Sequence, residues 1–229
     1  MQAGTDFIIL SGIMTIILSL AMSTFLGWKW YKQKVRLMTD LPLVFSITGL
    51  FQVLNMLLLT LPNIGVLEPS LELFRIRSLV IGGAIIPIMA AILQIWMPSY
   101  QKYHKRTIFF ATLYWFAIAL LGPSEAFIMT LTIPIILIIS VVMMVTFIVT
   151  WKTGRLKEIR SELLIVSSIF MMASQILRVP LMLTSLFYVP DIFLGVAMVL
   201  IAIGIANPWY AREKKKQSRE SQEVAPYLA

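Results

Sequence analysis

Residues 126–150 read AFIMTLTIPIILIISVVMMVTFIVT, a run of 25 residues without a charged side chain. An α-helix rises about 1.5 Å per residue, so this run would be about 37 Å long. The hydrocarbon core of a bilayer is about 30 Å thick, and only helices or closed barrels satisfy their backbone hydrogen bonds inside it. Because the run is continuously apolar and does not alternate, it predicts a membrane-spanning helix.

Six further apolar runs accompany this one along the chain. Together the seven cover about 7–27, 41–61, 77–98, 107–121, 126–150, 163–185 and 191–207. The chain has 229 residues, of which 59% are hydrophobic and 13% charged. A soluble domain has about 25% charged residues, so there is too little polar side chain here to cover a soluble globule. We therefore predict an all-α, multi-pass membrane protein with seven transmembrane helices.

The basic residues are concentrated in one set of connecting segments. Sixteen of the 19 follow the first, third, fifth and seventh runs. Basic loops stay on the cytoplasmic side, so we expect the N-terminus outside the cell membrane and the C-terminus inside. The basic cluster follows the first run, which argues against a cleaved signal. We expect residues 211–229 to form a disordered, basic cytoplasmic tail that contacts anionic lipid.

Matches at one constant offset point to an internal duplication. Shifting the chain by 123 residues places Trp28-Lys29 on Trp151-Lys152, and Gln52 on Gln175. Leucine matches also occur, but they carry little weight in a chain of this composition. The alternative is coincidence together with topology rules that both halves obey.

The duplication predicts two three-helix halves, at about 7–100 and 126–210, joined by a linking helix at about 107–121. Three is an odd number of helices, so the linking helix restores the direction and the halves run parallel. This 3+1+3 layout resembles the SWEET sugar transporters and the wider group that connects transporters, opsins and receptors. The resemblance covers nearly the whole chain of 1–210 and implies a solute pathway between the halves.

Several classes of chemistry are not expected. The chain has no cysteine, and its one histidine is His104. No Asp, Glu, Lys or His lies well inside a run, so the usual catalytic sets and carboxylate proton relays are missing there. The Schiff-base lysine of a retinal protein is missing too. We expect no enzyme, no metal and no cofactor, and no nucleic-acid partner because no basic stretch is long enough.

Four polar residues lie inside the predicted hydrocarbon: Gln52, Asn55, Gln175 and Arg178. Each half contributes two at i, i+3 spacing, which places them on one helix face. At the 123-residue offset the two pairs coincide, so we expect them at one depth, facing each other. They predict a binding site for a small polar or anionic solute, with Arg178 as a fixed cation.

These four residues also allow a structural interpretation. Glutamine and asparagine in membrane helices often hydrogen-bond a neighbouring helix. Arg178 could extend toward the outer interface or pair with an outer acid. The candidate acids are Glu68, Glu72, Glu125 and Asp191.

Two functions follow from these alternatives. The first is a transporter-like or permease-like protein with a polar pocket between two three-helix halves. The second is a non-catalytic membrane sensor, scaffold or accessory subunit that acts on a membrane-protein partner through helix and tail contacts. A transporter needs polar residues that converge on a cavity, whereas a scaffold is expected to have a filled core.

The charge distribution makes a topology prediction. An epitope tag at the N-terminus should react with an antibody applied to intact cells. A tag after Ala229 should react only after permeabilisation, because the basic segments on that side remain in the cytoplasm. A C-terminal tag that is labelled on intact cells would contradict the orientation.

Overall fold

The computed structural model describes residues 2–154, 158–181, 184, 186–208 and 210. These residues form seven α-helices, a short 3-10 turn and connecting loops, and none of them lies in a strand. The helices are α1 (Gln2–Tyr31), α2 (Leu41–Asn63), α3 (Leu71–Trp96), α4 (Gln101–Leu121), α5 (Glu125–Thr153), α6 (Ser161–Leu181) and α7 (Val189–Ala206), with the turn η1 at Pro98–Tyr100. The all-α prediction is confirmed. The predicted tail, 211–229, lies outside the described residues.

Local sequence signals set the helix ends. Ser70 caps α3 by accepting a hydrogen bond from the Leu73 amide at 3.2 Å, and Ser124 caps α5 in the same way through Phe127. Pro69 and Pro123 directly precede these serines. A proline disfavours helical backbone in the residue before it, so neither helix extends further toward the N-terminus. At the other end of α5, Gly154 adopts φ 62°, a left-handed conformation that favours glycine.

The outer end of α3 corrects one predicted boundary. The apolar run was predicted to begin at about 77, whereas α3 begins at Leu71. The Ser70 cap and the helix formers after it extend the helix beyond its apolar part. Arg77 therefore lies nearly two turns inside α3 and not in the loop before it. At α6 the prediction ran to 185, and the helix ends at Leu181.

Six of the helices, all except α4, are long and apolar enough to cross a membrane. The outward faces carry large apolar side chains, among them Phe110, Leu121 and Ile138, which are 64%, 78% and 63% exposed. Soluble monomers rarely expose contiguous apolar surface on this scale. Length, composition and surface thus agree on a helical membrane protein.

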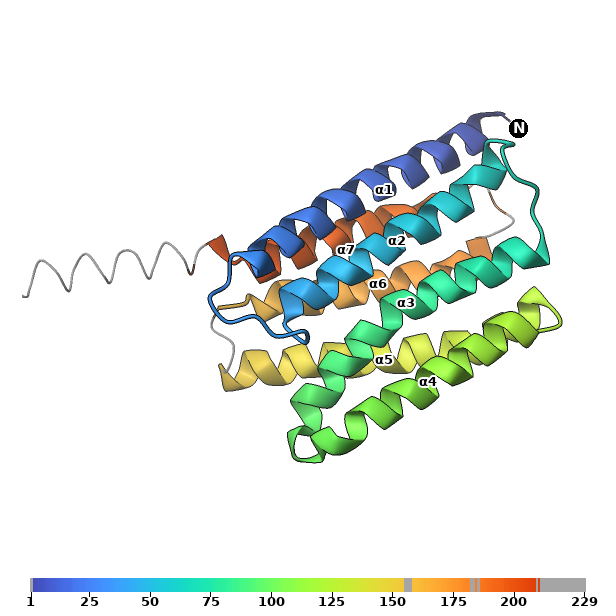
Figure 1. Ribbon diagram of the computed structural model, residues 1–229. Coiled ribbons are helices and arrows are strands. Elements are labelled where there is room, and N and C mark those ends of the chain that lie inside the picture. The colour runs from blue at the N-terminus through green and yellow to red at the C-terminus, as the bar shows by residue number, and fades with distance from the viewer. Residues whose placement is uncertain (1, 155–157, 182–183, 185, 209, 211–229) are drawn as a thin grey trace, which may run out of the picture.

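The helices lie side by side in one bundle (Figure 1). α2 packs between α1 and α3, and α6 packs between α5 and α7; contacts of α1 with α7 and of α3 with α5 close the ring. Exchanging α1–α3 with α5–α7 leaves this neighbour pattern unchanged. A parallel duplication requires that property, and the duplication itself stays a prediction.

Helix α4 lies outside this ring and packs mainly on α3. Its Trp115 is 3% exposed, and the indole Nε1 donates to the Ser78 carbonyl at 2.8 Å. The indole fits against α3 because Gly82 has no side chain: a Cβ atom there would lie 2.5 Å from Trp115 Cδ1. The contact between α3 and α4 thus depends on one glycine.

Gly82→Leu should therefore displace Trp115 and weaken the packing of α4. Overpacking of this kind costs about 1–3 kcal/mol in the free energy of unfolding. Ala117→Leu is the matched control, because Ala117 lies on the exposed face of α4. Reversible unfolding in mixed micelles measures both, and equal stability of the two variants would contradict the proposed contact.

Candidate functional site

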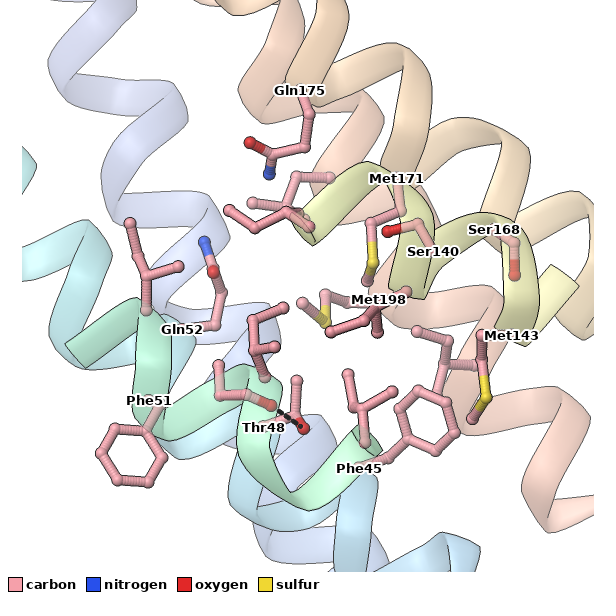
Figure 2. Close-up of a pocket in the computed structure, with 18 of the residues that line it drawn as sticks. Phe45, Thr48, Phe51, Gln52, Ser140, Met143, Ser168, Met171, Gln175 and Met198 are labelled. Carbon is pink, nitrogen blue, oxygen red and sulfur yellow. Dashed lines mark hydrogen bonds between the residues drawn. The ribbon is translucent and has the colours of Figure 1, made fainter. Parts of the chain in front are cut away.

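A cavity of about 130 Å³ lies between the two halves of the bundle. Its wall is formed by side chains of α2 and α3 from the first half and of α5, α6 and α7 from the second. Pockets for drug-sized ligands are usually about 300–1,000 Å³, so this cavity suits a much smaller occupant. Figure 2 shows part of the wall, with polar and sulfur-containing side chains around a shared space.

All four residues that the sequence singled out contribute to this wall: Gln52, Asn55, Gln175 and Arg178. Figure 2 shows Gln52 and Gln175 entering from opposite helices, with their amide ends turned toward the same space. The predicted convergence of the two halves on one location is therefore present in the structure. A role of these residues in binding stays a prediction.

The polar groups of the wall have unused hydrogen-bonding capacity. Gln52, Asn55, Ser140 and Gln175 make no side-chain hydrogen bond to any described residue. Asn55 is only 8% exposed, and its Oδ1 atom is fully buried. The structural interpretation expected the glutamines and asparagine to bond to neighbouring helices, and in the described part of the chain they do not.

Arg178 has a different environment from these neutral groups. Its Nη2 atom lies 2.7 Å from Asp191 Oδ1, and the two side chains are 19% and 3% exposed. Asp191 is one of the acids that the sequence offered as a partner. It was expected at the outer edge of the last apolar run, but it lies buried in the first turn of α7 because that helix begins at Val189.

Further hydrogen bonds join three helices around this ion pair. Ser11 of α1 donates to Asp191 Oδ2 at 3.3 Å, and Thr15 donates to the Asp191 carbonyl at 3.2 Å. Ser174 of α6 donates to the Pro190 carbonyl at 2.7 Å. The end of the cavity near Arg178 is thus held by a network that connects α1, α6 and α7.

Arg77 is a second cation in the cavity wall. The third apolar run was predicted to begin at about 77, which leaves Arg77 at the edge of that run and not inside a helix. The missed signal was Pro69-Ser70 followed by Glu72, a proline, an N-cap residue and an acid in the first turn, which together mark a helix start. A helix that begins at Leu71 places Arg77 on the face that also carries Ile81 and Ala84, both of which line the cavity.

The opposite end of the cavity carries mostly apolar side chains. Phe45 of α2 and Phe147 of α5 stack there with ring centroids 6.5 Å apart and an interplanar angle of 27°. Both are nearly fully buried, at 4% and 3% exposed. Ile88, Met143 and Met198 also line the cavity, together with the hydroxyl groups of Thr48, Ser167 and Ser168, which donate to backbone carbonyls. The cavity therefore has one charged part and one mainly apolar part in which the hydroxyl groups already have partners.

The described residues contain no group of three or more His, Cys, Asp or Glu that could hold a metal ion. Comparison with protein-family models, with curated proteins and with solved structures gives no match. The similarity in layout to the SWEET group thus stays a prediction that rests on the order of the helices.

The ion pair predicts strongly coupled substitutions. Arg178→Leu leaves a buried carboxylate without its cation, and Asp191→Leu leaves the cation without its carboxylate. Each should lower the free energy of unfolding by about 3–5 kcal/mol, and the double variant should recover much of that loss. Unfolding in mixed micelles measures the cycle.

Glu72→Gln serves as the control, because Glu72 pairs with Arg75 on the surface at 75% exposure. It should cost no more than about 1 kcal/mol. Additive losses in the Arg178 and Asp191 cycle would show that the two side chains do not depend on each other.

Proposed function

We propose that this protein is a transporter-like or permease-like membrane protein that admits a small polar or anionic solute to the cavity between its two halves. The observation that carries the proposal is a set of four polar side chains around one cavity, Gln52, Asn55, Ser140 and Gln175, none of which hydrogen-bonds to another described residue. Leu or Met could fill this space, and at Asn55 they would avoid the cost of a buried polar atom that lacks a partner. A polar solute in the cavity would supply hydrogen-bond partners for these side chains.

The proposal includes seven transmembrane crossings in the cell membrane. The start of α1 and the end of α7 lie at opposite ends of the bundle (Figure 1), as an odd number of crossings requires. Helix α4 is the crossing least favoured by composition, because its first turns carry Lys102, Lys105 and Arg106. Its apolar part, 107–121, runs alongside α3, and basic residues at a cytoplasmic interface suit this assignment.

The proposal also sets the N-terminus outside. With that orientation Arg77, Arg178 and Asp191 lie toward the extracellular side, and the Phe45–Phe147 stack lies toward the cytoplasm. A solute would then meet the charged part of the cavity first and the aromatic closure last. Conduction through the protein would require the two rings to separate.

The rival function is a non-catalytic sensor, scaffold or accessory subunit. It expects a filled core with polar groups that bond to neighbouring helices. In the described cavity wall Thr48 and Arg178 make such bonds, but Gln52, Asn55, Ser140 and Gln175 do not, and they surround a cavity. No observation specific to a partner surface favours the rival, so the solute pocket is the better-supported proposal.

Blocking the cavity tests the function. Purified protein in liposomes should speed the osmotic reswelling of vesicles in urea, glycerol or potassium nitrate, the last with valinomycin to balance charge. Ser140→Phe should return the rate to that of protein-free vesicles, because the ring would occupy most of a cavity of about 130 Å³. Stopped-flow light scattering measures the rates.

Ile138→Phe is the matched control, since Ile138 lies two residues away on α5 and faces outward at 63% exposure. It should reswell like the wild type. If wild-type vesicles pass none of these solutes faster than protein-free vesicles, or if Ser140→Phe passes them at the wild-type rate, the pocket has no transport role and the scaffold function is the better explanation.

A further inference from the structure

The charges in the cavity wall are not balanced. Among the described lining residues there are two arginines, Arg77 and Arg178, and no acidic residue. The one carboxylate next to the wall, Asp191, bonds to Arg178 and to Ser11. One pair of opposite charges is thus complete, and a second positive charge remains.

Arg77 carries that second charge. It has no hydrogen bond and no ion pair to a described residue, and its Nε atom is buried. Its guanidinium carbon lies 5.8 Å from the centroid of the Phe74 ring. Glu125 is exposed in the first turn of α5, does not line the cavity and forms no ion pair with Arg77. Arg77 is therefore a second cation in the wall of the cavity that Arg178 also lines, without a carboxylate partner among the described residues, in a region where such a charge is costly.

The shape of the cavity adds two limits on an occupant. A volume of about 130 Å³ is well below the range of about 300–1,000 Å³ that is usual for drug-sized ligands. The part near Ile88, Met143 and Met198 is mainly apolar, and the hydroxyls of Thr48, Ser167 and Ser168 there donate to backbone carbonyls. An occupant that suits both parts is small and has a charged head and a short apolar tail.

We propose that the cavity binds a small monocarboxylate anion, with its head at Arg77 and its tail toward the methionines. This rests on the proposed function and names its substrate class. One carboxylate neutralises the one uncompensated charge, and its planar oxygens match the fork of a guanidinium. The amides of Gln52 and Gln175 and the Ser140 hydroxyl supply further donors. Arg178 keeps Asp191 as its partner.

Propionate and propionamide provide a matched pair of probes, because they share a shape and differ in charge at neutral pH. With both present in one sample, saturation-transfer NMR on protein in lipid nanodiscs reports their methyl protons separately, against empty nanodiscs. Wild type should bind propionate in preference to propionamide. Arg77→Gln should weaken propionate binding by roughly tenfold or more, the loss of a charge-assisted hydrogen bond, and leave the amide signal unchanged.

Arg75→Gln is the control for charge, because it removes the same charge from the same helix at a residue that already pairs with Glu72. It should bind propionate like the wild type. Arg77→Lys keeps a cation without the planar fork and should retain part of the binding, which covers the case in which Arg77→Gln does not fold.

Three outcomes would overturn the inference. The first is propionamide binding as well as propionate. The second is a variant that contradicts its expectation: Arg77→Gln that binds propionate as well as the wild type does, or Arg77→Lys that folds but does not bind propionate. The third is no binding of either probe. If vesicles still pass urea or glycerol in that case, only the anion inference fails; if they pass nothing, the proposed function fails with it.

Discussion

The ion pair between Arg178 and Asp191 is the interaction on which the packing of α1, α6 and α7 at one end of the bundle depends. A charge inside a bilayer is costly unless a partner and hydrogen bonds compensate it, and here both are present. Asp191 receives bonds from Arg178 of α6 and Ser11 of α1, while its own carbonyl accepts from Thr15. Three helices meet at one carboxylate, and their positions relative to one another fix the second-half wall of the cavity.

The cavity wall differs from this network, because several of its polar side chains have no hydrogen-bond partner among the described residues. Lipid offers no hydrogen bonds, so a membrane protein normally satisfies each polar group internally. In the described part of the chain Gln52, Asn55, Ser140 and Gln175 make no side-chain hydrogen bond. The Asn55 Oδ1 atom is buried without a partner, which costs about 1–3 kcal/mol, while the other three side chains are half-buried in the cavity wall. One such residue is a local exception. Four around a common space form a surface suited to an occupant that brings its own donors and acceptors.

The sequence predicted most of the fold because a bilayer requires long, uniformly apolar helices, and these are easy to recognise in a sequence. Run length, uniform apolarity and the position of basic residues located seven helices, and the shared register of Gln52 and Gln175 predicted that they face one location. The largest differences are at the starts of α3 and α4, which begin at Leu71 and Gln101 where about 77 and 107 were predicted. Hydropathy alone also left Arg77 and Asp191 at the edges of their runs, whereas both lie inside helices. Charged residues in the first turns of a helix lower its local hydropathy, so capping signals such as Ser70 are the better guide to where a span begins. The sequence offered Asp191 as one of four acids that could pair with Arg178, and only the packing of α6 and α7 selects it. The absence of an ion pair between Arg77 and any described residue is visible only in the packed structure.

The two halves also differ in a way that bears on how such a site arises. At the offset of 123 residues Gln52 corresponds to Gln175, but Asn55 corresponds to Arg178. The same position is thus neutral and unpartnered in the first half, and charged and paired in the second. If the halves descend from one unit, that unit already had polar residues at these two positions, and the charge of Arg178 arose after the two halves diverged. The second cation, Arg77, comes from α3 of the first half, so neither half alone provides the two arginines. An anion bound in this cavity would contact both halves. Its binding could therefore favour one arrangement of the two halves over another.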